Sequence, residues 1–388
     1  MTEQLKLKLN DSKATRWGAL VIVAFTMMAA YYVNDVVAPL KTMLETDLAW
    51  SSTDFGFFTG GYSFLNVFFL MLIWGGLILD RFGIRFTGKL ATILMVGGTA
   101  LEYYAMTGLA GADATLFGIN EIFGYKTGVF VAFAGYSIFG VGAEVAGITV
   151  SKIIAKWFKG KELATAMGVQ VALARIGSQA GYAVAIPLAR AFGISTPVLL
   201  GLVLLLGGMI AFFIFAVMDK KLDKQMEAAA IAAGTEDEEE KFSFKDVKNI
   251  LVNPGFWLIA LLCVLFYSCV FPFQKFASEL MIIKYGINEN VAGTFAGLPA
   301  LGALILTPVF GGFIDKRGKS ASIMLLGSAM LICVHFIYAI PDINYWLVAI
   351  VLMIILGIAF SLVPSAMWPA VAKIFPVSQL GTAYALIF

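Results

Sequence analysis

The chain has 388 residues, of which 60% are hydrophobic and only 13% are charged. An ordinary soluble domain carries roughly 25% charged residues, so this composition excludes a soluble globular fold and indicates an integral membrane protein. The formal net charge of +2 is spread over short loops, which excludes the concentrated basic face that nucleic acid requires.

Long apolar runs divide the chain into predicted transmembrane helices. About 20 helical residues cross a hydrocarbon core, and backbone groups in lipid must bond internally, so we expect an all-α polytopic fold. An eleventh run begins near Leu380 and ends with the chain at Phe388, which is too short to cross a bilayer. Ten complete spans are predicted, at 17–40, 53–79, 87–108, 127–151, 163–189, 195–218, 254–283, 288–314, 320–340 and 344–367.

The basic residues predict the topology. Lys and Arg gather in the N-terminal tail and after the second, fourth and eighth spans, whereas the opposite loops carry few of them. By the positive-inside rule the N-terminus is cytoplasmic. The tail has neither a cleavable signal nor an acidic dileucine signal, which favours a bacterial inner membrane over a lysosomal one. The predicted parts are a cytoplasmic tail (1–16), a six-helix bundle (17–218), a cytoplasmic linker (219–253) and a second bundle (254–388).

One motif occurs twice, each time after the second span of its half. Its glycines suit a tight turn and its acid suits a helix end. The repeat resembles the signature loop of the major facilitator superfamily, which implies two six-helix bundles that rock around a midplane site. The second bundle is incomplete here, with about 10.5 spans in all. The motif comprises Gly76, Asp80, Arg81, Gly83 and Arg85 in the first copy and Gly311, Asp315 and Lys316 in the second.

The resemblance implies that this loop latches the cytoplasmic face through Asp80 and opens in each transport cycle. The expected partner of Asp80 is the N-terminus of the eleventh span. The alternative is a basic turn that only sets topology. Two glycine pairs, Gly177 with Gly181 and Gly293 with Gly297, predict closely packed or sliding helices.

Two ionisable side chains lie deep in predicted spans. An ionised group near the bilayer centre costs at least about 2.5 kcal/mol, so each should face a partner or a wet cavity. Glu144 in the fourth span and Arg175 in the fifth are equidistant from the turn at Lys159 and Gly160. Residues equidistant from the turn of an antiparallel hairpin lie at similar depth, so we expect the two to meet near the midplane. A purely structural ion pair is the alternative.

The flanking motifs narrow the resemblance. Several segments are similar to the major facilitator superfamily domain-containing protein 1 family, whose members are lysosomal dipeptide transporters. These segments are Trp157–Leu163, Ala174–Ser178, Glu144 upstream of them, and 379–384 near the end of the chain. This resemblance implies facilitated dipeptide transport without ion coupling, with Glu144 and Arg175 in the pocket. The chemistry fits, because a carboxylate pairs with the peptide ammonium and an arginine fork grips its carboxylate.

Other polar residues in the spans are candidate substrate contacts. Asp35 belongs to a polar cluster in the first span and lies either at the substrate path or at the outer interface. Lys275 follows Pro272, where a broken helix would line a cavity, or else it snorkels outward. His335 is interpreted as a satisfied or interfacial side chain, and the three cysteines as small core residues. The candidates besides Glu144 and Arg175 are Tyr32, Asn34, Asp35, Gln179, Gln274, Lys275 and Trp368.

Three alternatives to a dipeptide carrier stay open: an organic-anion or monocarboxylate carrier, a proton-coupled symporter, and a non-transporting membrane sensor with the same fold. The sequence has no Walker loop, no nucleophile–base pattern and no metal-ligand spacing, so we expect no enzymatic activity and no cofactor. The expected partners are the lipid bilayer and a small-molecule substrate, with the protein acting as a monomer and no nucleic acid involved.

Overall fold

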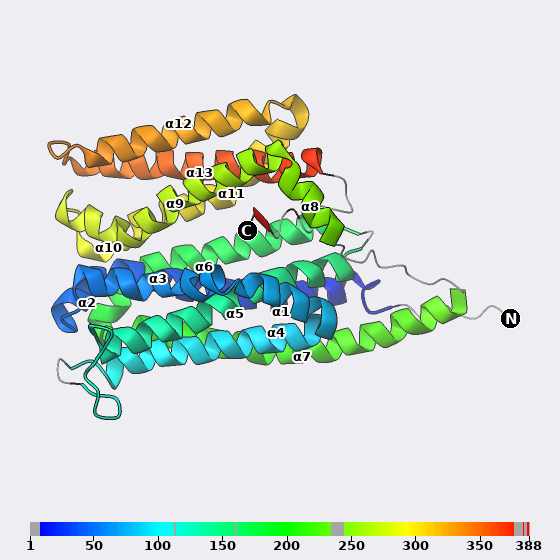
Figure 1. Ribbon diagram of the computed structural model, residues 1–388, viewed down its shortest axis with the longest axis horizontal. Coiled ribbons are helices and arrows are strands. Elements are labelled where there is room, and N and C mark those ends of the chain that lie inside the picture. The colour runs from blue at the N-terminus through cyan, green and yellow to red at the C-terminus, as the bar shows by residue number, and fades with distance from the viewer. Residues whose placement is uncertain are drawn as a thin grey trace. The chain divides into compact units, whose positions relative to one another are not determined.

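The computed structural model describes residues 8–111, 114–159, 161–233 and 244–375, together with Ala383, Leu386 and Ile387. The chain divides into two compact units. The first comprises Met1–Gly181 and Leu188–Glu238, and the second comprises Tyr182–Pro187 and Glu239–Phe388. Both are built from helices (Figure 1). The start of the predicted eleventh span at Leu380 lies outside the described residues.

The first unit carries long helices and one small hairpin. Ser51 begins α3 with a capping box that it shares with Asp54, which satisfies free backbone N–H groups of the first turn. The elements are α1 (Lys13–Val36), η1 (Ala38–Leu40), α2 (Lys41–Asp47), α3 (Ser52–Phe68), α4 (Met71–Thr107), β1 (Glu121–Ile122), β2 (Tyr125–Lys126), α5 (Thr127–Trp157), α6 (Leu163–Phe192) and α7 (Thr196–Ala233).

The described part of the second unit consists of helices joined by short turns, without strands. Its α9 begins and ends at the predicted bounds, 254 and 283, and runs without interruption through Pro272. The expectation of a broken helix beside Gln274 and Lys275 is therefore wrong. Proline has no backbone N–H, so α9 loses one hydrogen bond at Pro272 but continues past it. The elements are α8 (Phe244–Val252), α9 (Pro254–Ile283), α10 (Glu289–Ala296), α11 (Leu298–Arg317), α12 (Ser320–Ala339) and α13 (Trp346–Ile374).

The apolar helices make the chain polytopic. Among the described residues, seven helices are long and apolar enough to cross a membrane, or eight if the pair α3 and α4, bent by 58°, is one span. Ten spans were expected. The predicted span 163–189 is absent from the seven because α6 carries Arg175 and Gln179, which lower its mean hydropathy. The predicted spans 53–79 and 87–108 fall on the bent pair.

The bent pair differs from the two predicted spans in where it breaks. The predicted span 53–79 is interrupted at Phe69 and Leu70, and Leu70 has a left-handed φ of 53°. Phenylalanine and leucine are both common in helices, so these two residues do not explain the break. Farther on, α4 holds two helical segments joined at Gly83, whose φ of 74° and ψ of 173° are not helical. The predicted tight turn thus falls on a glycine, which adopts this conformation without a Cβ clash.

Small residues bring the helices of the first unit together. A Cβ on Gly98 of α4 would overlap the backbone of Gly135 and Phe139 on α5. A Cβ on Gly177 of α6 would likewise overlap the Met28 carbonyl on α1. Side chains this small allow backbones to approach closely in a membrane, where packing replaces the hydrophobic effect. The prediction from the spacing of Gly177 and Gly181 is therefore confirmed for the first unit.

Two helices occupy parts of the predicted linker 219–253. Helix α7 continues to Ala233, and α8 occupies Phe244–Val252. Asp219, predicted as the first linker residue, is completely buried. Its carboxylate is met by Lys156 and by the Trp157 indole, which lets the helix continue past the apolar run.

Candidate substrate-binding site

Glu144 lies in the middle of α5 and is hydrogen-bonded to a side chain of α3. The hydroxyl of Tyr62 donates a hydrogen bond of 2.8 Å to Oε1 of Glu144. The two helices are close here because Gly140, one turn before Glu144, has no side chain to collide with the Tyr62 carbonyl. The acid is half-buried. A neutral donor thus orients the carboxylate at a depth where an ion is costly.

Arg175 lies in α6 and packs on an aromatic ring from α1. Its guanidinium carbon is 5.6 Å from the centroid of the Tyr31 ring, which is cation–π distance. The contact follows from the close approach of α1 and α6 at Gly177 and Gly181, where a Cβ would meet the backbone of Met28 and Tyr32. The planar guanidinium therefore rests against a flat surface, which favours one orientation of its hydrogen-bonding fork.

Tyr31 connects the charged side chains. Arg175 lies against its ring, and the charges of Glu144 and Asp35 lie within electrostatic range of its hydroxyl. These three side chains come from helices α6, α5 and α1. The first unit therefore gathers two carboxylates, one guanidinium and the hydroxyls of Tyr31 and Tyr62 around one point of its interior.

A second polar group flanks this point on α1. Asn34 donates a hydrogen bond of 2.9 Å from Nδ2 to Asp35. Tyr136, which is fully buried on α5, donates to the Asn34 carbonyl at 2.7 Å and lies at 3.1 Å from Asn34 Oδ1. The Tyr136 ring is 5.6 Å from that of Tyr62. Asn34 and Asp35 thus continue the polar group around Glu144.

The remaining candidates lie elsewhere. Tyr32 is 3% exposed and donates to the Pro197 carbonyl, so its hydroxyl faces α7. Gln179 is half-buried one turn after Arg175 on α6. In the second unit Gln274 and Lys275 are half-buried on α9, and Trp368 on α13 packs against a core cluster that includes Phe256. Nothing in the sequence distinguished Tyr32, which faces α7, from Tyr31, which lies against Arg175.

Sequence reasoning placed Tyr31 only in the polar cluster around Asp35 and missed Tyr62 and Tyr136. The chain has 13 tyrosines, and their type alone does not tell which of them face Glu144. Tyr31 did carry a signal, because it precedes Asp35 by four residues and so shares its helix face. Tyr62 and Tyr136 lie in aromatic runs where nothing distinguishes them from packing residues.

The repeated loop shows the same backbone feature in both copies. Gly83 has a φ of 74° and Gly318 one of 66°, and each follows the motif aspartate by three residues. A Cβ on Gly76 or Gly311 would meet open space, and the close contact in the first copy belongs instead to Gly75, which packs on Val145. The side chain of Asp315 lies outside the described residues.

The ion pairs of the first copy form at the end of the first unit where α5 ends and α6 begins, hereafter the basic end. Asp80 pairs with Lys152 of α5 at 2.8 Å. Arg85 pairs with Asp223 at 2.8 Å and lies 3.7 Å from Asp219 of α7. Arg81 and, in the second copy, Arg317 lie over neighbouring phenylalanine rings. The partner expected for Asp80 in the eleventh span lies outside the described residues.

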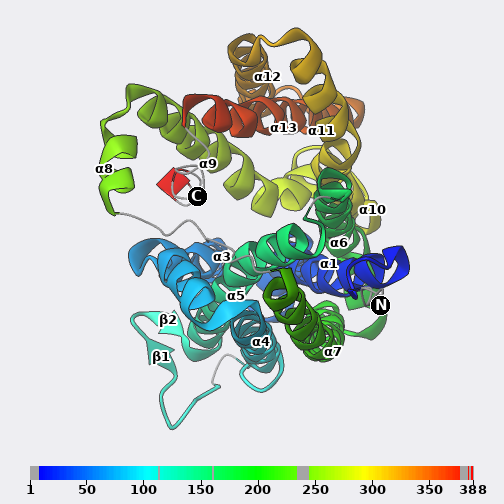
Figure 2. The ribbon, with the colours of Figure 1, turned by 90° about the vertical axis from the view of Figure 1, so that its right-hand side faces the viewer.

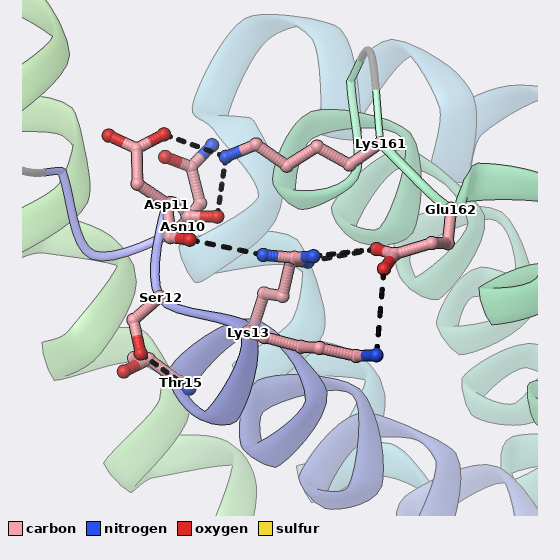
Figure 3. A network of polar contacts seen from close by, with 8 residues as sticks. Asn10, Asp11, Ser12, Lys13, Thr15, Lys161 and Glu162 are labelled. Atoms are coloured by element: carbon pink, nitrogen blue, oxygen red, sulfur yellow. Dashed lines mark hydrogen bonds and ion pairs between the residues drawn. The ribbon is translucent and has the colours of Figure 1, made fainter.

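The N-terminal segment is also tied to the basic end (Figure 3). Arg16 donates to Glu162 from Nε at 3.1 Å and from Nη2 at 2.7 Å. Lys161 pairs with Asp11 at 2.8 Å. The hydrogen bond from Arg16 holds the pKa of Glu162 below its usual range, and that from Lys161 does the same for Asp11. These contacts tie the start of α1 to the turn between α5 and α6.

Comparison with known proteins identifies the family. The model of the Major Facilitator Superfamily matches residues 20–388, nearly the whole chain. The chain belongs to the Major Facilitator Superfamily. It is accordingly a multi-pass secondary transporter and not an enzyme.

The relatives and the solved structures agree with this assignment. The human protein "Lysosomal dipeptide transporter MFSD1" is 29% identical over 385 residues, which cover 96% of this chain and 76% of the relative. The chicken protein of the same name is 33% identical over 263 residues, 64% of this chain and 56% of that protein. A D-xylose–proton symporter has a TM-score of 0.66 at 17% identity, covering 96% of this chain and 86% of that one. A peptide transporter POT crystallised with sulfate has a TM-score of 0.65 at 13% identity, covering 95% and 85%.

Proposed function

We propose that this transporter moves dipeptides or other small peptides across the membrane by alternating access, without ion coupling. The observation that carries the proposal is the convergence of Glu144 and Arg175 on Tyr31. A zwitterionic peptide has an ammonium at one end and a carboxylate at the other. An acid and a guanidinium in one site match those two charges, and a bidentate arginine contact adds geometric selectivity.

The tyrosines support this assignment of roles. Tyr62 donates a hydrogen bond to Oε1 of Glu144, which fixes the carboxylate and leaves Oε2 to accept from the peptide ammonium. Tyr31 supports the guanidinium plane of Arg175. Hydrogen bonds to charged groups contribute about 1.5–3 kcal/mol each, so two oriented charges discriminate strongly against ligands that lack one terminus. The name of the human relative points to the same substrate class.

The experiment is uptake of a labelled dipeptide into proteoliposomes, with competition by two capped analogues. N-acetylation removes the ammonium and C-amidation removes the carboxylate. For the parent protein we expect both analogues to compete poorly. Glu144→Gln should lose its discrimination against the acetylated peptide, and Arg175→Ala its discrimination against the amide, each with slower uptake of the uncapped dipeptide.

The matched control is Arg190→Ala, which removes an exposed arginine from the far end of the same helix α6. It should transport like the parent. If Arg175→Ala also transported like the parent, the proposed pocket would be wrong. Competition by monocarboxylates and not by peptides would favour an organic-anion carrier, whereas uptake that required a pH gradient would favour a proton symporter. Binding without any uptake would favour a sensor.

The proposed orientation has the N-terminus in the cytoplasm, because the basic residues of the first unit gather at the end where α1 begins. The proposed location is a bacterial inner membrane and not a lysosomal one. Cysteine accessibility at residue 8 in right-side-out vesicles tests the orientation. Labelling of Lys8→Cys by an impermeant reagent in intact vesicles would contradict it.

A further inference from the structure

The segment between α4 and α5 forms a short hairpin with two exposed phenylalanines. Leu116 and Ile119 exchange two backbone hydrogen bonds of 3.0 Å around Phe117 and Gly118. Ile122 and Tyr125 are paired around Phe123 and Gly124. Residues 114–126 are called the aromatic hairpin below. Two tight turns thus follow one another within ten residues, and each presents a Phe-Gly pair.

Both phenylalanines occupy unfavourable positions. Phe117 has a φ of 54° and Phe123 a φ of 53°, in the left-handed region that bulky residues seldom adopt. Asn or Gly at these positions would form the same turn with less strain. The side chains are also 94% and 88% exposed. An aromatic ring that is both strained and solvent-facing, at two equivalent turns, indicates a surface that contacts something outside the chain.

The base of the aromatic hairpin is fixed, so the tips are held in place. Tyr125 stacks on Phe57 of α3 with ring centroids 3.9 Å apart. Lys126 donates to the Ala49 carbonyl at 2.5 Å, and Thr127 donates to the Ile119 carbonyl at 2.8 Å. The Phe123 ring lies 5.9 Å from that of Phe130 in the first turn of α5. The tips are therefore presented from a rigid base.

The position of the hairpin indicates what it contacts. It joins the end of α4 at Thr107 to the start of α5 at Thr127, so it lies where these spans reach the membrane surface. Figure 1 shows it at the ends of α4 and α5, and Figure 2 shows it extending sideways beyond both helices. The ring contact from Phe123 to Phe130 continues into α5, a helix apolar enough to span a bilayer.

We propose that the aromatic hairpin rests on the bilayer surface beside α4 and α5 and inserts Phe117 and Phe123 into the boundary between lipid headgroups and acyl chains. Aromatic side chains are enriched at this depth in membrane proteins. The hairpin carries one acid, Glu121, and one base, Lys126, so insertion depends on apolar contact and not on anionic lipid. It anchors the connection between α4 and α5, and thereby the start of the helix that carries Glu144.

The test is spin-label accessibility in nanodiscs of neutral phosphatidylcholine, with Cys263, Cys269 and Cys333 replaced by alanine. Labels at Phe117→Cys and Phe123→Cys should be more accessible to oxygen, which concentrates in lipid, than to a water-soluble nickel complex. The label at Glu121→Cys, on the same hairpin, should show the opposite order. A preference for the nickel complex at residues 117 and 123 would overturn the proposal.

Two further outcomes are decisive. Labels at 117 and 123 shielded from both reagents would mean that protein covers the tips, either a second copy or a partner, and would reject lipid contact. A depth that appeared only with anionic lipid would reject apolar insertion.

A variant that keeps the turns guards against misfolding. Phe117→Asn/Phe123→Asn creates two Asn-Gly pairs, the favoured sequence for such turns, so the hairpin should form. A label at Glu121→Cys should keep its line shape, because the base of the hairpin is rigid, but the nickel complex should reach it more readily in nanodiscs, because the tips no longer hold the hairpin against the bilayer. Unchanged accessibility of residue 121 to the nickel complex in this variant would contradict the proposal.

Discussion

The middle of the first unit and its basic end satisfy their charges in different ways. At the basic end, acids meet bases: Asp80 pairs with Lys152, and Asp219 is met by Lys156. In the middle, Glu144 accepts from the neutral hydroxyl of Tyr62, and Arg175 rests on the Tyr31 ring. Ion pairs between full charges are suited to holding helices in one arrangement. The Tyr62 hydroxyl orients the Glu144 carboxylate and carries no charge of its own, which suits a site that must bind a charged ligand.

The glycine contacts that build the middle site give the largest expected effect. Gly140→Ala places a methyl against the Tyr62 carbonyl and forces α3 away from α5. Overpacking of this kind costs about 1–3 kcal/mol or more, which exceeds the roughly 1 kcal/mol that alanine gains over glycine in a helix. Thermal unfolding in detergent should show a lower Tm and transport should be lost.

Gly147→Ala on the same helix is the matched control. Its Cβ would have only the Met27 methyl, at 3.9 Å, as a neighbour. The Tm of this variant should be unchanged or slightly higher. Equal effects of the two substitutions would mean that the close approach of α3 and α5 does not limit stability.

The buried acid of the basic end gives the next effect. Asp219→Asn removes the charge that Lys156 meets at 2.7 Å in a fully buried position. Because Lys156 remains 23% exposed and can turn to water, we expect a loss of about 2 kcal/mol, less than for a wholly buried pair. Asp223→Asn, at a carboxylate 41% exposed, should cost under about 1 kcal/mol. A larger loss of stability in Asp223→Asn than in Asp219→Asn would mean that the exposed acid, and not the buried one, holds this end together.

Removing one hydroxyl from the middle should have a smaller effect on stability and a clear effect on transport. Tyr62→Phe deletes the donor to Glu144 and leaves the ring in place. Dipeptide uptake should fall by roughly tenfold or more, because Glu144 loses the donor that orients it. The Tm should change less than in Asp219→Asn, because Glu144 is only half-buried and water can replace the lost donor. Tyr104→Phe, at a 44% exposed ring, is the control and should transport normally. Normal uptake by Tyr62→Phe would show that Glu144 needs no orienting hydroxyl.

Different parts of the molecule were predictable to different degrees. The bounds of α9 and the choice of Glu144 and Arg175 as candidates follow from the cost of polar groups in lipid, which can be read from the sequence residue by residue. The contacts of Tyr62 and Asp219 depend on which helices touch, and no local pattern encodes that. The aromatic hairpin was missed because Phe is an unusual residue at a left-handed position, so its turns lack the usual Asn or Asp signal.

The contact between the N-terminal segment and the turn after α5 gives the smallest effect and depends on pH. The lowered pKa values of Glu162 and Asp11 mean that the folded state favours the ionised carboxylates. Their contribution is therefore complete above the ordinary values of 4.5 and 3.8 and is lost as the pH falls below them.

Hydrogen exchange at residues 10–16 should accordingly be the same at pH 7 and pH 5, after correction for the intrinsic rate, and should rise below about pH 4. Glu162→Gln should raise it at neutral pH, because it removes the acceptor of Arg16. Lys13→Gln, whose ammonium lies 4.0 Å from Glu162 and is mostly exposed, should leave it nearly unchanged. Release of the segment between pH 7 and pH 5 would contradict the direction of both shifts and would point to a group other than these two carboxylates.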